Sequence, residues 1–274
     1  MAESSPPNVL AGVKNIVAVA SGKGGVGKST TAANLALAMA SKGMRVGLLD
    51  ADIYGPSIGL MFGVPEGQRP EVVDEKYFVP VVAHGVSLMS MAFLVNDNTP
   101  MVWRGPMASG ALLQMLQQTV WGELDLLVVD MPPGTGDIQL TLAQKAQLAG
   151  AVIVTTPQDL ALLDARKAIE MFHKVQVPVL GIVENMATHI CSNCGHEEAI
   201  FGLGGGEAVA EEYDTTLLGS LPLNIHIRLQ ADGGKPSLVA EPEGDVAKLY
   251  AVIASGVTAA LESRGPQSGP ELIL

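Results

Sequence analysis

Short apolar runs alternate along most of this chain with longer segments of mixed polarity. Runs of strand length, rich in Val, Ile and Leu, occupy residues 15–20, 45–50, 124–130, 151–155, 179–183 and 217–221. Uninterrupted apolar runs of this length are typical of strands that are buried on both faces, as in a parallel sheet.

The segments between these runs have helical character. We predict helices over residues 31–40, 107–120, 138–149, 159–174 and 245–261. Alternation of strands and helices predicts an α/β fold, a doubly wound and mostly parallel sheet with helices on both faces. Residues 55–100 break the rhythm, and we interpret them as an insertion with a short antiparallel pair, 77–82 with 86–91. Its methionines (Met89, Met91, and Met101 just beyond) could face a partner, although core filling is their more frequent use.

Composition limits the class of protein. With 274 residues, 48% hydrophobic and 16% charged, the chain can form one domain, which we place at 13–264 between a flexible tail at 1–12 and another at 265–274. The net charge of −12 repels phosphate backbones and anionic lipid, so neither nucleic acid nor membrane is expected as a partner. The sequence shows no signal peptide, transit peptide or membrane-spanning run, so we expect a cytoplasmic protein.

A glycine-rich loop lies between the first predicted strand and helix. Gly22, Gly27, Lys28 and Ser29 satisfy the P-loop pattern G-x-x-x-x-G-K-[ST]. In such a loop backbone N–H groups surround phosphate oxygens, the lysine reaches the β- and γ-phosphates, and the hydroxyl holds Mg²⁺. We therefore expect ATP and Mg²⁺ as cofactors. The predicted nucleotide contacts in this segment are Gly22, Lys23, Gly24, Gly25, Val26, Gly27, Lys28, Ser29 and Thr30.

Acidic residues follow two other predicted strands. Asp50 and Asp52 end one strand, and Asp130 ends another before a Gly/Pro-rich turn. Carboxyl ends of parallel strands meet at the edge where such sheets bind ligands. Asp130 is thus predicted to hold a Mg²⁺-bound water, while Asp50 could instead cap the following turn. Arg104 is a candidate anion contact or a structural ion pair.

Lys23 extends the loop to K-G-G-x-G-K-[ST], which resembles the deviant Walker A loop of the SIMIBI class of dimeric P-loop ATPases. The resemblance implies that Lys23 crosses a homodimer interface to the partner's nucleotide, whereas the alternative is a solvated loop lysine. It further implies that Asp52 orients the attacking water, that Asp50 lies near the metal, that Asn185 hydrogen-bonds adenine and that Pro222 belongs to the loop over the base. Lys23, Lys28 and Asp52 are the predicted catalytic residues.

The two cysteines, Cys191 and Cys194, form a C-x-x-C pair, which is half of a tetrahedral thiolate site. Three interpretations of this cysteine pair are open. His189 and His196 could complete a zinc knuckle, a second chain could supply two more thiolates for a [4Fe-4S] cluster, or the pair could act as a redox dithiol.

Further strings resemble the Mrp/ApbC group of iron-sulfur cluster carriers. They are Trp103-Arg104-Gly105-Pro106, Val183-Glu184-Asn185-Met186, the two cysteines, and Phe201-Gly202. The resemblance implies a homodimeric ATPase that holds a bridging [4Fe-4S] cluster on Cys191 and Cys194 and transfers it to apo iron-sulfur proteins. The alternatives are a MinD/ParA-like positioning ATPase with a structural zinc knuckle, and an ATP-driven iron-sulfur reductase.

Overall fold

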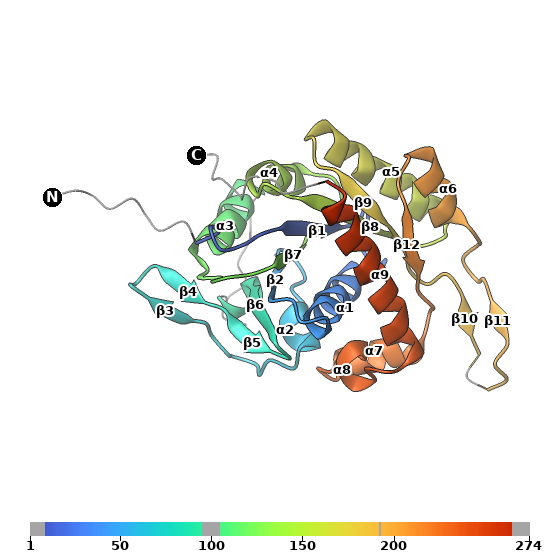
Figure 1. Ribbon diagram of the computed structural model, residues 1–274, viewed down its shortest axis with the longest axis horizontal. Coiled ribbons are helices and arrows are strands. Elements are labelled where there is room, and N and C mark those ends of the chain that lie inside the picture. Colours follow the sequence, from blue (N-terminus) through green and yellow to red (C-terminus); the bar gives the residue numbers. More distant parts are fainter. Residues whose placement is uncertain (1–8, 95–104, 192, 265–274) are drawn as a thin grey trace.

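The protein is built on one central sheet of eight strands. The computed structural model describes residues 9–94, 105–191 and 193–264. The strand order is β12-β9-β8-β1-β7-β2-β6-β5, and all neighbours are parallel except β5, which runs antiparallel to β6 at one edge (Figure 1). The strands are β1 Ile16–Ala20, β2 Val46–Asp50, β5 Val81–Ala83, β6 Val86–Ser90, β7 Leu126–Asp130, β8 Gly150–Thr155, β9 Val179–Glu184 and β12 Leu217–Ser220. The doubly wound, mostly parallel sheet predicted from the sequence is confirmed.

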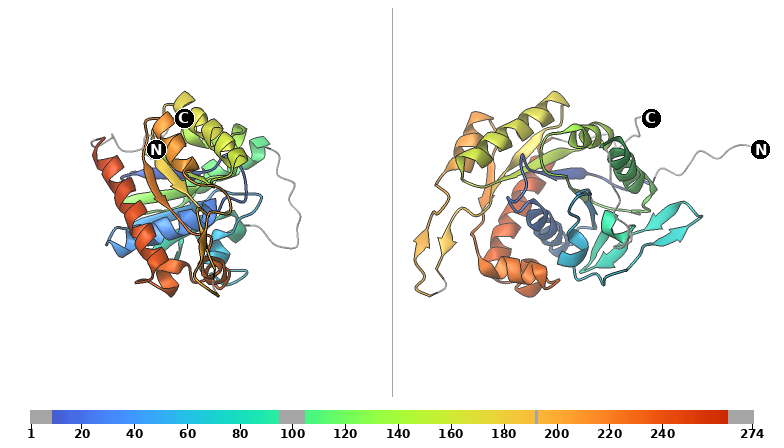
Figure 2. Two further views of the ribbon diagram at one scale, coloured as in Figure 1. Left: turned by 90° about the vertical axis from the view of Figure 1, so that its right-hand side faces the viewer. Right: turned by 180° about the vertical axis from the view of Figure 1, so that it is seen from behind.

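Helices cover both faces of this sheet (Figures 1 and 2). One face carries α1 Lys28–Ser41, α2 Ile58–Met61, α7 Ile225–Asp232, α8 Ser237–Ala240 and α9 Asp245–Glu262. The other carries α3 Gly105–Gln118, α4 Asp137–Lys145, α5 Asp159–Lys174 and α6 Gly205–Glu212. Strands β1, β2, β7, β8 and β9 are buried at every residue, as expected for strands packed on both sides. Among the described residues, no helix has both the length and the apolar character that crossing a bilayer requires.

The segment interpreted as an insertion differs from that prediction. Strand β6 is buried and pairs in parallel with β2, so it belongs to the central sheet. The expected antiparallel pair is half right, because β5 pairs with β6 while β4 (Tyr77–Val79) pairs with β3 (Glu71–Val73). Met89 and Met91 are core residues, since both are buried. Met101 lies outside the described residues.

The first described residues also differ from the loose tail expected at 1–12. Leu10 is buried, and the backbone N–H of Leu124 donates to the carbonyl of Gly12. Residues 9–12 therefore pack against the domain.

Two further strands form a hairpin outside the central sheet. They are β10 (His189–Ile190) and β11 (Glu197–Glu198), and the hairpin that they form projects beyond the body of the domain (Figures 1 and 2). The two cysteines lie in the turn between them.

Candidate functional site

The glycine-rich loop joins β1 to α1 and is shaped by close contacts. Gly27 has a φ of 82° and precedes the first residue of α1. A Cβ atom there would lie 2.1 Å from Nδ2 of Asn185, and one on Gly22 would lie 1.9 Å from the carbonyl oxygen of Asp164. Only glycine fits both positions, so the loop is held tightly between β9 and α5.

Lys28 lies among the acidic residues predicted for the site. Its Nζ is 2.6 Å from Oδ1 of Asp130 and 3.9 Å from Oδ2 of Asp52, and it donates to Oγ of Ser29 at 3.2 Å. Asp130 reaches this position because β7 lies beside β1, with Val19 opposite Asp130 in the register. The sheet therefore brings together the loop lysine, the loop serine and both acids.

Asp130 is a buried carboxylate with spare bonding capacity. Burial raises its pKa, and the charge of Lys28 acts in the opposite direction. Its Oδ2 atom is buried and has no hydrogen-bond partner among the residues that the structure describes. A buried, unpaired carboxylate oxygen is costly unless a ligand satisfies it.

Asp50 has a different environment, although it lies opposite Asp130 in the register of β2 and β7. Its Oδ2 accepts from the backbone N–H groups of Ser57 and Ile58 and from Oγ of Ser90, and its Oδ1 accepts from the N–H of Asp52. These contacts support the alternative that Asp50 caps the turn into α2. Burial, together with the charge of Asp130, raises the pKa of Asp50 to about 7.

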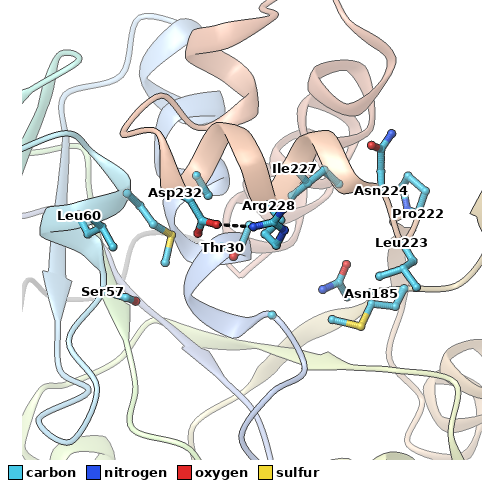
Figure 3. Close-up of a pocket in the computed structure, with 14 residues that line it drawn as sticks. Thr30, Ser57, Leu60, Asn185, Pro222, Leu223, Asn224, Ile227, Arg228 and Asp232 are labelled. Atoms are coloured by element: carbon cyan, nitrogen blue, oxygen red, sulfur yellow. Dashed lines mark hydrogen bonds and ion pairs between the residues drawn. The ribbon is translucent and has the colours of Figure 1, made fainter. Parts of the chain in front are cut away.

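A cavity of about 350 Å³ opens beside the loop (Figure 3). It is lined by Gly27 and Thr30 on one side and by Asn185 and Pro222 on another, so four of the predicted nucleotide contacts meet here. The sheet explains this meeting, because the loops after β1, β9 and β12 leave the same edge.

Helix α7 forms a wall of this cavity that the sequence analysis missed. It contributes Ile227, Arg228, Ala231 and Asp232. The helix begins after Asn224, whose side chain accepts from the N–H of His226 at 2.8 Å. An asparagine before a short apolar pattern is a helix N-cap signal, and it could have revealed α7.

Asn185 connects the cavity to the loop. Its Nδ2 donates to the carbonyl of Val26 at 2.9 Å, and the residue is buried. One amide N–H is therefore engaged by the loop itself, in addition to the adenine contact that the resemblance implies.

Lys23 precedes the exposed stretch of the loop. It is half-buried, and in the described part of the chain its ammonium makes no hydrogen bond or ion pair. The neighbouring Gly24 and Gly25 are exposed, and a Cβ on either would meet nothing within 4 Å. This stretch of loop is thus accessible from outside the domain.

The cysteine hairpin is separate from the cavity. Cys191 donates its N–H to the carbonyl of His196, and Gly195 donates to the carbonyl of Cys191, which closes the turn. Cys191 is half-buried and Cys194 is exposed, and both are free thiols. Backbone hydrogen bonds from Cys194 and Asn193 lower the pKa of Cys191, which favours the thiolate that binds metals.

The hairpin begins close to the cavity in sequence and is tied to its rim. Ala187 donates to the carbonyl of Leu221, and Leu223 donates to the carbonyl of Thr188. After the hairpin, the N–H of Gly206 at the start of α6 donates to the carboxylate of Glu184, the last residue of β9. Both ends of the segment are therefore anchored to the sheet.

Within the residues that the structure describes, no group of three or more His, Cys, Asp or Glu side chains is arranged to hold a metal ion. The arrangement of His189 and His196 with both cysteines that a zinc knuckle requires is therefore not present there. Arg104, the other candidate contact, lies outside the described residues.

Comparison with known proteins extends these observations. A family model described as ParA: NUBPL iron-transfer P-loop NTPase matches residues 12–258. The chain is 70% identical to an iron-sulfur cluster carrier protein of Pseudomonas fragi, over 89% of this chain and 85% of the relative. It is 50% identical to the iron-sulfur cluster transfer protein NUBPL of Mus musculus, over 93% and 80% of the two chains.

Solved structures with the same fold include a related nucleotide-binding protein and a cell division ATPase. A nucleotide-binding protein from Archaeoglobus fulgidus in complex with ADP is 39% identical, with a TM-score of 0.76 over 89% of this chain and 96% of that one. The cell division ATPase MinD of Pyrococcus furiosus, at 22% identity and a TM-score of 0.67 over 90% and 99% of the two chains, shares the fold. On the family match and these identities, the chain belongs to the NUBPL-type iron-transfer family of P-loop NTPases.

Proposed function

We propose that this protein is an ATP-binding and ATP-hydrolysing homodimer that carries a bridging [4Fe-4S] cluster and transfers it to apo iron-sulfur proteins. The observation that carries the proposal is the hairpin turn, which presents two free thiols, Cys191 and Cys194, in a family of iron-transfer NTPases.

The loop residues have the chemistry for a nucleotide. Gly22 to Thr30 surround the phosphates with backbone N–H groups, and the Lys28 ammonium neutralises the β- and γ-phosphates. Asn185 and Pro222 hold the base in the 350 Å³ cavity. Lys23, which precedes the accessible stretch of the loop, reaches the nucleotide of the second subunit.

The acidic residues fit Mg²⁺. The buried, unpartnered Oδ2 of Asp130 is suited to accept from a metal-bound water, and the Ser29 hydroxyl is suited to bind the ion directly. When bound, Mg²⁺ supplies positive charge to the phosphate oxygens. Asp52, half-buried and 3.9 Å from the Lys28 ammonium, orients the attacking water.

The cluster is cargo held at the subunit boundary. A [4Fe-4S] cluster takes four thiolates, whereas one chain has two cysteines. A two-fold axis beside the hairpin supplies the other pair without further sequence. Because Cys194 is exposed and Cys191 is half-buried, thiolates of an acceptor protein can reach the cluster and displace them.

Anaerobic reconstitution followed by iron, sulfide and zinc analysis tests this proposal. We expect about four iron and four sulfide atoms per dimer, the content of one such cluster. Cys191→Ser and Cys194→Ser should each abolish cluster binding, while the matched control Ser220→Ala should retain it. One zinc per monomer that is lost on His189→Ala or His196→Ala, with no iron bound, would contradict the proposal.

Cluster transfer separates a carrier from a reductase. After reconstitution, the cluster should pass to an apo protein that has its own cysteine ligands. A cluster that remains on this protein through many ATP turnovers, while an electron acceptor is reduced, would instead support the ATP-driven reductase.

A further inference from the structure

We propose that Arg228, on α7, is a nucleotide-binding residue that contacts the α-phosphate. The inference rests on the proposed function, because it assumes that the nucleotide occupies the cavity beside the loop. It adds a contact from a helix that carries none of the P-loop motifs.

The first observation is the charge of the cavity wall. Among the described residues that line the cavity, Arg228 is the single basic side chain and Asp232 the single acidic one. The protein has 16 Lys and Arg against 28 Asp and Glu, so a cation facing a candidate nucleotide cavity is unlike the general surface. An anionic ligand in the cavity has this one guanidinium to contact.

The second observation is its place along the cavity. In the proposed nucleotide site, Asn185 and Pro222 contact the base, whereas the loop with Lys28 contacts the β- and γ-phosphates. Thr30, in the first turn of α1 two residues after Lys28, lines the same cavity as Arg228 (Figure 3). Arg228 therefore faces the part of the nucleotide between the base and the terminal phosphates, where the α-phosphate lies.

The third observation is the state of the guanidinium. Its Nη1 atom is 2.9 Å from Oδ2 of Asp232, one helical turn along α7. In the described part of the chain this is its only hydrogen bond or ion pair, so the remaining N–H donors are available. Asp232 restrains the side chain without occupying its full bonding capacity.

The alternative is an ordinary surface pair. Such exposed i,i+4 pairs contribute little to stability, and Arg228 is 62% exposed. If the pair had this role alone, removing it would change neither the melting temperature nor the nucleotide affinity by a measurable amount. Nucleotide affinity therefore distinguishes the two roles.

The test compares Arg228→Ala with the wild-type protein and with Arg166→Ala. Arg166, which is half-buried, is the control, because it is also a helix arginine paired with an acid, Glu212 at 2.8 Å, and does not line this cavity. Binding of ATP, ADP, AMP and adenosine is measured by competition against a fluorescent ATP analogue. Melting curves confirm that the variants are folded.

We expect Arg228→Ala to weaken binding of ATP, ADP and AMP by about tenfold each and to leave adenosine within about twofold. The KM for ATP should rise while kcat is kept, because the contact is the same in the ground and transition states. Arg228→Lys should recover part of the affinity. Equal affinity of Arg228→Ala and wild type for ATP, or an equal loss for adenosine, would overturn the inference. Failure of the wild-type protein itself to bind ATP would instead overturn the proposed nucleotide site.

Discussion

The nucleotide cavity and the cysteine hairpin differ in how much of a site one chain completes. The cavity is assembled from the loops after β1, β9 and β12 and from helices α1, α2 and α7, and the charged groups of the adjoining loop, Lys28 and Asp130, are buried and paired with each other. The hairpin has two strands of two residues each, and its turn presents two thiols. One chain thus contains a whole candidate pocket for binding a nucleotide, to which the proposed dimer adds only the partner's Lys23, but it contains only half of a four-thiolate site.

The difference has a physical basis in the fold. A parallel sheet fixes the positions of loops that leave its carboxyl edge, so a complete binding pocket can be built from the residues of one chain. A small hairpin that projects from the domain has little core of its own, and it can be reached from outside. The first arrangement suits a bound cofactor, and the second suits a cargo that must be handed on.

Lys28→Ala should have the largest effect. It should lower ATP turnover and leave the cysteine hairpin unchanged. The variant loses the ammonium that neutralises the terminal phosphates, so ATP turnover should fall by roughly 10³-fold or more. It also leaves the buried Asp130 carboxylate without its 2.6 Å partner, so a melting curve must accompany the assay. Cluster reconstitution should be retained. Normal ATP turnover in this variant would remove the nucleotide assignment.

Lys23→Ala should give a different result from Lys28→Ala, although both change a lysine of the same loop. Lys23 has no partner within the described chain, so its removal should leave ATP affinity within about twofold. Hydrolysis should fall by about 10²-fold or more if the ammonium acts in the second subunit's site, as cationic groups supplied in trans do. Binding and single-turnover hydrolysis measure the two separately. Unchanged turnover at saturating ATP would contradict a role for Lys23 across the dimer.

Cluster loading should strengthen the dimer. A ligand that binds only the dimer favours it by mass action, so reconstituted protein should dissociate at a concentration about tenfold lower or more than cluster-free protein. Sedimentation over a dilution series measures this, and an iron chelator should reverse it. Cys191→Ser and Cys194→Ser should lose the shift and keep ATP binding. Equal dimer dissociation with and without cluster would place the cluster within one chain or at another surface.

The sequence predicted the elements around the glycine-rich loop and Asp130 better than the strands of the cysteine hairpin. The reason is the periodicity of the apolar residues. Buried strands such as β1 and β7 have apolar runs that end in the loop or in Asp130, so their meeting follows from a parallel sheet. The apolar run of β6 lies among glycines and prolines, so the sequence pattern predicts an insertion there rather than a strand of the central sheet. No sequence rule indicates that an irregular stretch adds a strand beside β2.

The elements missed were short, and their structure depends on contacts distant in sequence. Strands β10 and β11 have two residues each, too few for a pattern, and α7 has eight. The cap role of Asp50 was one of two alternatives, since a carboxylate after a strand can bind a metal or a turn. The hydrogen bonds from Ser57 and Ile58 support the cap, and these depend on the path of the chain after Asp52.

The smallest predicted effect concerns Asp50 and the pH dependence of stability. Its pKa in the folded protein is about 7, above the value of about 3.9 for an unfolded aspartate, because of burial and the charge of Asp130. Between these two values the folded state binds more protons than the unfolded state. The free energy of unfolding should therefore decrease as pH rises from about 4 to about 7, by a few kcal/mol at most, at ~1.4 kcal/mol per pKa unit.

Asp50→Asn isolates this contribution because an amide does not titrate. Its oxygen can replace Oδ2 and accept from Ser57 and Ile58, although the amide nitrogen then faces the N–H of Asp52. Asp125→Asn is the matched control: hydrogen bonds from Arg45 and Lys14 lower the pKa of Asp125, so it stays ionised across this pH range. Denaturant unfolding at a series of pH values should show a smaller slope for Asp50→Asn and the wild-type slope for Asp125→Asn. An unchanged slope in Asp50→Asn would mean that Asp130, the other buried acid of the site, carries the titration, because it is then the remaining carboxylate whose pKa burial raises.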